Sequence, residues 1–319
     1  MFTMKPKPSI DDFIRSCTPL AVLPELEREI QSRVDAITSA LIAHHDVDDP
    51  IENLANFLQA DRNFLGVILA LTNLSQEKFL RILSASRFAT GDYGTEWGPS
   101  RIYTKLQNEP DFARQVARLF IEGQKNPLLA RHVAAFYLKQ LALPDDWSDI
   151  IRDKNLVQGA VRQKLQGEYN VKKGGMIEQI IREQLDNLTT TYNVSHTKGQ
   201  VRLVGGKEVD HVLPTLDDPH IMIMSSYMET TSSSQTARAN EQREMYLRVQ
   251  GENQRYGGQR IFINFVDGAG WLARRSDLRK LHASCDYILN LNTLDQLRGI
   301  ICRYMPDQYI TNRPSVDEV

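Results

Sequence analysis

The sequence predicts two regions of different fold class, an all-α region over residues 1–150 and an α/β region over residues 151–319. Three observations lead to this prediction. Apolar residues recur at helical spacing through the first region. From about residue 155, short β-rich runs alternate with helical ones. Between the two, LALPDDWSD at 141–149 combines a proline, acids and a tryptophan, which is typical of a domain boundary.

Composition excludes several classes of protein. Hydrophobic residues make up 41% of the chain and charged residues 24%, as in an ordinary globular protein. No apolar run approaches the roughly 20 residues that cross a bilayer, and MFTMKPKPSIDDF lacks the apolar stretch of a signal peptide. The three cysteines are scattered without metal-ligand spacing, which favours a reduced, cytoplasmic setting.

The charge is close to neutral but unevenly distributed. Residues 1–150 contain 16 Lys and Arg against 20 Asp and Glu, and residues 151–319 contain 22 against 20. This balance does not by itself indicate nucleic-acid binding, which usually gives a strongly basic domain. It does not exclude it either, because a groove can be basic while the total charge is near zero.

The first region is predicted to be helical throughout. PELEREIQSRVDAITSALIAHH begins with Pro24 in its first turn and keeps Leu26, Ile30, Val34 and Ile37 at helical spacing. Four further runs continue the pattern: IENLANFLQA, QEKFLRILSA, EPDFARQVARLFIEG and LLARHVAAFYLKQLAL.

The second region is predicted to follow the order α-β-β-β-α-β-α-β-α from residue 174. GGMIEQIIREQLDNL forms the first helix, and QVRLVG and EVDHVLP form a hairpin across Gly205-Gly206. DDPHIMIMSSYM is apolar enough for a central strand. The remaining elements are QTARANEQREMYLRV, RIFINFVDG, RRSDLRKLHAS, CDYILNL and TLDQLRGIICRYM.

Asp210 is the first candidate functional residue. It lies within the apolar strand EVDHVLP, where a carboxylate is costly unless it is paired or binds a metal. In the next strand, alternation places Ser225 and Tyr227 on one face at the strand's end, where they can meet a neighbouring acid. Glu241 follows in the next helix, at a spacing that predicts a position on its apolar side.

These residues resemble the PD-(D/E)XK nuclease fold of type II restriction endonucleases, with its αβββαβ core and mixed sheet. The acid-x-Lys of the third strand is replaced by Ser225-Ser226-Tyr227. One branch of these enzymes has Ser-x-Lys there and carries its metal-binding glutamate in the following helix, and Glu241 stands fourteen residues after Tyr227. VDGAGW, SDLRKL and CDYILNL are also similar to restriction-enzyme sequence. The resemblance covers roughly residues 165–300.

The resemblance implies a Mg²⁺ site, because phosphodiester cleavage uses hard oxygen ligands that leave the metal most of its waters. Asp210 and Glu241 would bind the ion directly, and Glu178 would hold a metal-bound water. Glu229, which is nearer to the third strand in the sequence, is the alternative to Glu241 as the second metal ligand. No small-molecule cofactor is expected.

The family's lysine has no counterpart at position 227, and three residues are alternatives for its role. Tyr227 is a weak base, with an unperturbed pKa of about 10. Arg238 supplies charge but does not deprotonate water. Lys207 lies three residues before Asp210 and can reach in from the end of the hairpin.

The turn after the third strand is the candidate DNA contact. Hydroxyl and amide groups at the start of a helix can donate to phosphate oxygens, and the predicted set is Thr231, Ser232, Ser233, Ser234, Gln235 and Arg238. The structural alternative is a helix N-cap. Asp210 can likewise be a paired structural acid, Glu178 and Glu241 solvated helix residues, and Ser225 and Tyr227 packing residues.

Taken together, these features predict a type II restriction endonuclease of a restriction-modification system, which cuts double-stranded DNA at a short specific site. A homodimer is expected from the family and from the symmetry of such sites. The helical region would serve DNA recognition or dimerisation. The rival hypothesis is a non-catalytic DNA-binding or defence protein with a degenerate nuclease fold.

Overall fold

The computed structural model describes residues 6–144 and 146–313 and divides into two compact units. One unit comprises Pro24–Val171, and the other combines Met1–Leu23 with Lys172–Val319. Across the described ranges, no helix has both the length and the apolar character that crossing a bilayer requires.

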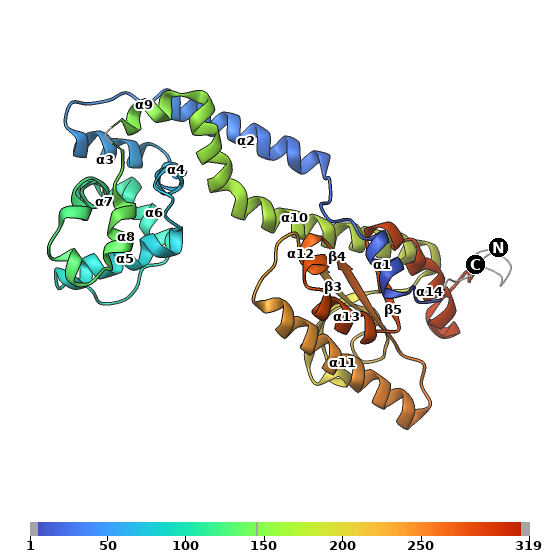
Figure 1. The fold of residues 1–319 in the computed structure, drawn as a ribbon. Helices are drawn as coiled ribbons and strands as arrows, with labels where there is room; N and C mark the ends of the chain where they lie inside the picture. Colours follow the sequence, from blue (N-terminus) through green and yellow to red (C-terminus); the bar gives the residue numbers. More distant parts are fainter. Residues whose placement is uncertain (1–5, 145, 314–319) are drawn as a thin grey trace. The chain divides into compact units, whose positions relative to one another are not determined.

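The unit Pro24–Val171 is all-helical, as predicted (Figure 1). Several of its helices have side-chain caps, including Asp49 before α3 and Ser75 before α5. Aromatic residues such as Phe57, Phe79 and Phe120 are fully buried in its core. Its helices are α2 (Pro24–Ile42), α3 (Pro50–Ala60), α4 (Phe64–Leu71), α5 (Gln76–Ala89), α6 (Pro99–Asn108), α7 (Pro110–Glu122), α8 (Ala135–Leu138), α9 (Trp147–Arg152) and the first half of α10 (Lys154–Tyr192).

The other unit is α/β and contains the remaining elements. They are α1 (Ile10–Ser16), the second half of α10, β1 (Thr197–Val201), β2 (Lys207–Pro214), β3 (Pro219–Tyr227), α11 (Ser234–Tyr256), β4 (Ile261–Asp267), α12 (Ala269–Ala273), α13 (Arg275–Ala283), β5 (Tyr287–Leu289) and α14 (Gln296–Tyr304). The predicted order from the first helix onward is confirmed, with the short α12 added after β4.

The five strands form one mixed sheet in the order β1-β2-β3-β4-β5. The pairs β1–β2 and β2–β3 are antiparallel, whereas β3–β4 and β4–β5 are parallel. Helices α10 and α14 pack on one face through Ile177 and Leu297, and α11 and α13 pack on the other through Met245 and Leu278 (Figure 1). Covered on both faces, β4 is buried at every position, as central strands are.

The N-terminal segment belongs to the α/β unit, which the sequence did not predict. Phe13 of α1 is fully buried in the layer beside α11 and α13. The backbone N–H of Thr18 donates to the Asp267 carboxylate at 2.7 Å. These contacts link residues far apart in the sequence, so local sequence patterns do not predict them. The prediction that the chain divides near residue 150 is a statement about which segments fold independently, and it stays a prediction.

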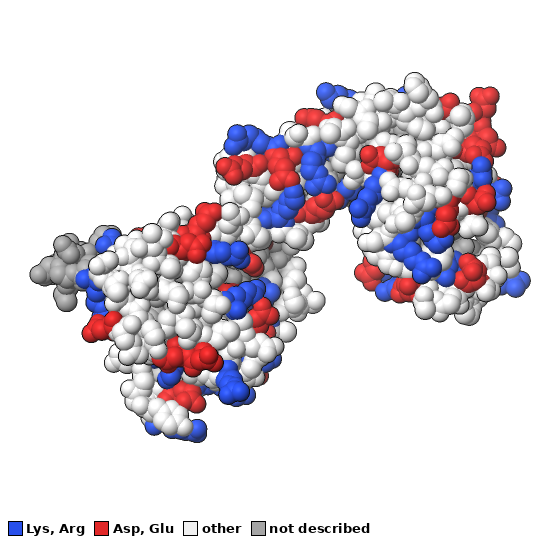
Figure 2. Space-filling model, turned by 180° about the vertical axis from the view of Figure 1, so that it is seen from behind, with Lys and Arg blue, Asp and Glu red and all other residues white. Residues whose placement is uncertain are grey.

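The surface charge matches the near-neutral composition. On the face shown in Figure 2, Lys and Arg side chains lie intermixed with Asp and Glu, with uncharged surface between them. Any charged site must therefore be identified from local contacts rather than from the total charge of a region.

Candidate functional site

Asp210 lies in β2 and is held against the end of β3. Its Oδ2 atom accepts hydrogen bonds from the backbone N–H of Ser225 at 2.8 Å and from the Ser225 hydroxyl at 3.2 Å. The side chain is 22% exposed, so it is fixed on one side and open to solvent on the other. The expected meeting of Asp210 and Ser225 is confirmed, and the Oδ1 atom is left to face a cation.

That cation is Lys198 of β1. Its Nζ atom lies 3.5 Å from Asp210 Oδ1 and 3.3 Å from the Glu208 carboxylate, where the register between β1 and β2 shifts. Burial opposes the charge on Lys198, but the carboxylates of Asp210, Glu208 and Glu178 outweigh it and raise the pKa of the ammonium group above its ordinary value. Lys198 therefore carries a positive charge at neutral pH beside Asp210.

Lys198 was missed in the sequence because the connection in the hairpin is longer than predicted. A turn of Gly205-Gly206 alone would place Val201 opposite Asp210. In the structure, Arg202–Val204 form a short 3₁₀ helix before the two glycines, and Val201 pairs with Lys207. Counting outward from that pair places Lys198 opposite Asp210, where oppositely charged residues attract each other across the strands.

A small pocket of about 60 Å³ gathers several predicted site residues. Glu178 of α10, Ser225 and Tyr227 of β3 and Arg238 of α11 all line it. The Arg238 guanidinium donates to the hydroxyl of Ser226 at 3.0 Å, which places it at the end of β3. The pocket thus joins residues that lie up to 91 positions apart in the sequence, since it takes in both Gly174 and Phe265.

Tyr227 is an anchor for the N-terminal segment. Its hydroxyl donates to Glu229 at 2.6 Å and accepts the backbone N–H of Ala21 at 2.8 Å. Burial and the neighbouring Glu229 carboxylate raise the Tyr227 pKa well above its ordinary value, so the hydroxyl stays protonated. Glu229 also forms an ion pair with Lys173, which is only 4% exposed. Both Tyr227 and Glu229 are therefore committed to contacts within the protein.

Glu241 does not lie on the apolar side of α11, and that part of the prediction is wrong. The buried face of the helix includes Ala239, Gln242 and Met245, whereas the Glu241 side chain is 45% exposed. It forms an ion pair with Lys207 at 3.0 Å. The helix is rotated about its axis relative to the prediction, so that Gln242 rather than Glu241 faces the core. Asp210 and Glu241 are thus held by different lysines.

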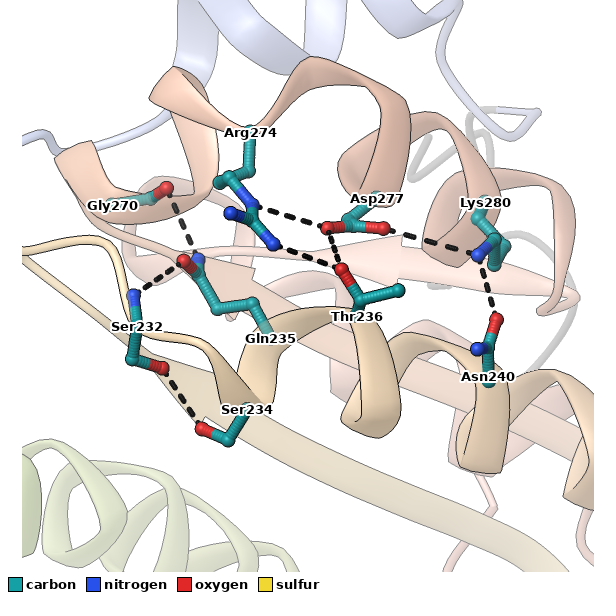
Figure 3. A network of polar contacts seen from close by, with 9 residues as sticks. All are labelled: Ser232, Ser234, Gln235, Thr236, Asn240, Gly270, Arg274, Asp277 and Lys280. Atoms are coloured by element: carbon teal, nitrogen blue, oxygen red, sulfur yellow. Dashed lines mark hydrogen bonds and ion pairs between the residues drawn. The ribbon is translucent and has the colours of Figure 1, made fainter.

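Gln235 holds the hydroxyl-rich turn before α11 in place through two hydrogen bonds. This side chain is fully buried, and its amide donates to the Gly270 carbonyl at 3.1 Å while accepting the backbone N–H of Ser232 at 2.9 Å (Figure 3). Ser232 and Ser234 share a hydrogen bond between their hydroxyls at 2.8 Å. Since both ends of the Gln235 amide are used, this residue positions the turn, and the hydroxyl residues around it are the exposed part.

A second set of contacts fixes the first turns of α11 against α13. The buried Asp277 accepts from the Thr236 hydroxyl at 2.8 Å and from Arg274 at 3.2 Å (Figure 3). Arg274 also donates to the Thr236 hydroxyl at 2.8 Å. Lys280 donates to Asn240 one turn further along α11 at 2.6 Å. A buried carboxylate with several partners is rigid, so the turn is presented in one orientation.

The carboxylates near the end of β3 determine which kind of metal ion the site could hold. Within the described residues, no three His, Cys, Asp or Glu side chains form a group that could enclose an ion. Glu178 lines the pocket beside Ser225, the residue whose backbone N–H and hydroxyl bind Asp210. Mg²⁺ commonly binds through one or two carboxylates, waters and substrate phosphates rather than in an all-protein cage. These oxygen ligands fit that kind of site and do not fit a structural zinc site.

The α/β unit is similar to a known family of nucleases. Residues 153–298 match the family model of the DpnII restriction endonuclease. This range holds all five strands, with Asp210, Lys198 and the hydroxyl-rich turn. No curated protein and no solved structure matches the chain.

Proposed function

We propose that this chain, whose residues 153–298 form a DpnII restriction endonuclease domain, hydrolyses phosphodiester bonds at the end of β3, with Asp210 at the centre of the site. Its family is one of deoxyribonucleases, which implies site-specific cleavage of DNA, and such enzymes typically use a divalent metal. The observation that carries the proposal is the Asp210 carboxylate, fixed by Ser225 and facing Lys198. The finer proposals are that the substrate is double-stranded DNA with a short recognition site and that the metal is Mg²⁺.

We assign the metal contacts to Asp210 and Glu178. Bound there, Mg²⁺ would neutralise charge on the phosphate and lower the pKa of a bound water. Asp210 would present Oδ1, the oxygen that faces Lys198, because Ser225 holds Oδ2. Glu241 is the alternative second carboxylate, and it would have to leave Lys207 to serve.

Lys198 is our candidate for the positive charge that β3 does not supply. Because the surrounding carboxylates keep it protonated, it would stabilise negative charge on the phosphate rather than accept a proton from water. Lys207 and Arg238 are the alternatives for this role. Lys207 pairs with Glu241, and Arg238 lines the pocket beside Ser225. We assign Tyr227 to anchoring the N-terminal segment.

The hydroxyl-rich turn is proposed to contact the DNA backbone. Thr231, Ser233 and Ser234 are exposed on the turn, and Arg238 is exposed one turn into α11. The buried Gln235 holds them in place, so few degrees of freedom are lost when they meet a phosphate. Contacts of this kind position a protein on DNA without reading the sequence.

Three further expectations belong to the proposal. The enzyme acts in the cytoplasm, and it forms a homodimer, since a two-fold symmetric dimer suits a palindromic site. The helical region 1–150 and the nuclease region 151–319 are the proposed folding units, with recognition or dimerisation as the task of the first.

Cleavage of bulk genomic DNA tests the proposal against its rival. With Mg²⁺ the protein is expected to give discrete fragments, and with a chelator it is expected to give none. The rival, a non-catalytic DNA-binding protein, is favoured by the absence of a carboxylate or lysine at 225–227. Binding without fragments under any divalent metal would support the rival, and neither binding nor fragments would contradict both.

A further inference from the structure

A second pocket lies in the unit Pro24–Val171. The proposed reaction gives this pocket no role. It has a volume of about 700 Å³, more than ten times that of the pocket beside Ser225. Side chains from α2, α4, α6 and α10 line it, together with the turn between α3 and α4. A hollow of this size can accept a group much larger than a single ion.

The charged residues of this pocket have a positive surplus. Arg33, Arg62 and Lys164 line it, with Glu168 as the one carboxylate among the lining residues. Glu168 lies 2.8 Å from Arg33 and 2.9 Å from Lys164. Burial alone would raise the pKa of Glu168, but Lys164 and Arg33 lower it below its ordinary value, so the carboxylate is ionised. Two cations thus share one anion, and Arg62 adds a third.

Arg62 is the cation without an acidic partner. Among the described residues, no carboxylate lies within ion-pair distance of it. Its guanidinium lies 5.4 Å from the centre of the Tyr103 ring, which also lines the pocket. Stacking on a ring holds a guanidinium in place while its N–H groups stay available. An arginine held in this way is suited to a phosphate, which it can bind with two parallel hydrogen bonds.

Lys164 reaches the pocket along a glycine. A Cβ atom placed on Gly66 would lie 2.6 Å from Cγ of Lys164, closer than side chains tolerate. The ammonium group donates to Asn63 at 2.5 Å in addition to its ion pair with Glu168. The backbone of α4 and the side chain of Asn63 therefore fix this lysine at the pocket wall.

We propose that this pocket binds phosphate groups of the DNA backbone, so that the helical unit forms a second contact with the substrate. The unit Pro24–Val171 contains 17 Lys and Arg against 20 Asp and Glu, so this group of cations is a local departure from the unit's charge. The proposal rests on DNA being the substrate. It assigns Arg62 a direct contact and Lys164 a supporting one.

The test is the salt dependence of DNA binding by the full-length protein. Each phosphate contact adds about 0.9 to the slope of log affinity against log salt. With a duplex probe and Ca²⁺, Arg62→Gln is expected to lower affinity on the order of tenfold and to reduce the slope by about one. Lys164→Gln should act in the same direction. Arg118→Gln is the matched control, because Arg118 is exposed on α7 outside the pocket.

The outcomes separate this proposal from the one on which it rests. If wild-type protein binds and cuts DNA while Arg62→Gln matches Arg118→Gln in affinity and slope, the pocket proposal is wrong and the nuclease assignment stands. If wild-type protein binds no duplex, both fail. If Arg62→Gln loses affinity only for a free deoxynucleotide and not for duplex, the assignment to DNA is wrong. Thermal unfolding of each variant checks that the helical unit is intact.

Discussion

Replacement of Lys198 by alanine separates a catalytic role from a structural one. Lys198 lies 3.3 Å from Glu208 and 3.5 Å from Asp210, but its side chain is 51% exposed. Exposed ion pairs contribute about 0.2–1 kcal/mol to stability. Asp210 keeps both hydrogen bonds from Ser225 in the variant. Lys198→Ala should therefore lower the free energy of unfolding by about 1 kcal/mol or less.

The expected loss of activity is much larger. A positive charge held beside the reacting phosphate acts on charge that develops in the transition state, and removal of one such group costs roughly 2.7–4 kcal/mol, a factor of about 10²–10³ in rate. Lys198→Arg keeps the charge and should recover part of the rate. Expressed as free energies, the expected loss in catalysis exceeds the expected loss in stability several-fold. Unfolding therefore cannot account for the loss of activity.

The assay is single-turnover cleavage of a cognate duplex, with urea unfolding measured on the same preparations. Lys125→Ala, an exposed residue of the helical unit, is the control for loss of a positive charge. Lys207→Ala tests the lysine that pairs with Glu241. A Lys198→Ala enzyme that cuts at the wild-type rate would refute the reasoning, and a larger effect of Lys207→Ala would move the role to that residue.

Three other predictions concern the ligands, the core and the domain boundary. Glu178→Gln should reduce cleavage more than Glu241→Gln, because Glu178 lines the pocket at Ser225, which binds Asp210, whereas Glu241 is paired with Lys207; the reverse order in the cleavage assay would assign the metal contact to Glu241 instead. Asp267→Ala should lower the free energy of unfolding by about 3 kcal/mol or more, because three backbone N–H groups lose their buried acceptor; a loss below about 1 kcal/mol in urea unfolding contradicts this. Limited proteolysis should cut first within 141–156, and cuts confined to other positions would argue against the predicted boundary.

Much of the fold could be predicted because its signals are local. Helical spacing identified the first region, and the Gly205–Gly206 turn with the apolar run at 221–224 identified the sheet. The meeting of Asp210 with Ser225 followed from strand alternation and the order of the strands. Each of these inferences needs only the period of an element and its neighbour.

The parts that were missed depend on tertiary contacts. Helix α10 runs for 39 residues through Gly174 and Gly175, where the sequence suggested a start, because packing on both units outweighs the weak helical preference of glycine. The rotation of α11 depends on Gln242 being accepted inside the core. The N-terminal segment joins the α/β unit through Asp267, a contact spanning 249 positions.

The most direct test of the central claim is Asp210→Ala, measured for cleavage and for binding in parallel. Because the side chain is partly exposed, the variant is expected to fold and to bind duplex DNA in Ca²⁺ with near wild-type affinity. Its Mg²⁺-dependent cleavage should be lost, since no other carboxylate in the described residues is held by Ser225 and faced by Lys198. A folded Asp210→Ala protein that still cuts DNA at the wild-type rate would contradict the account.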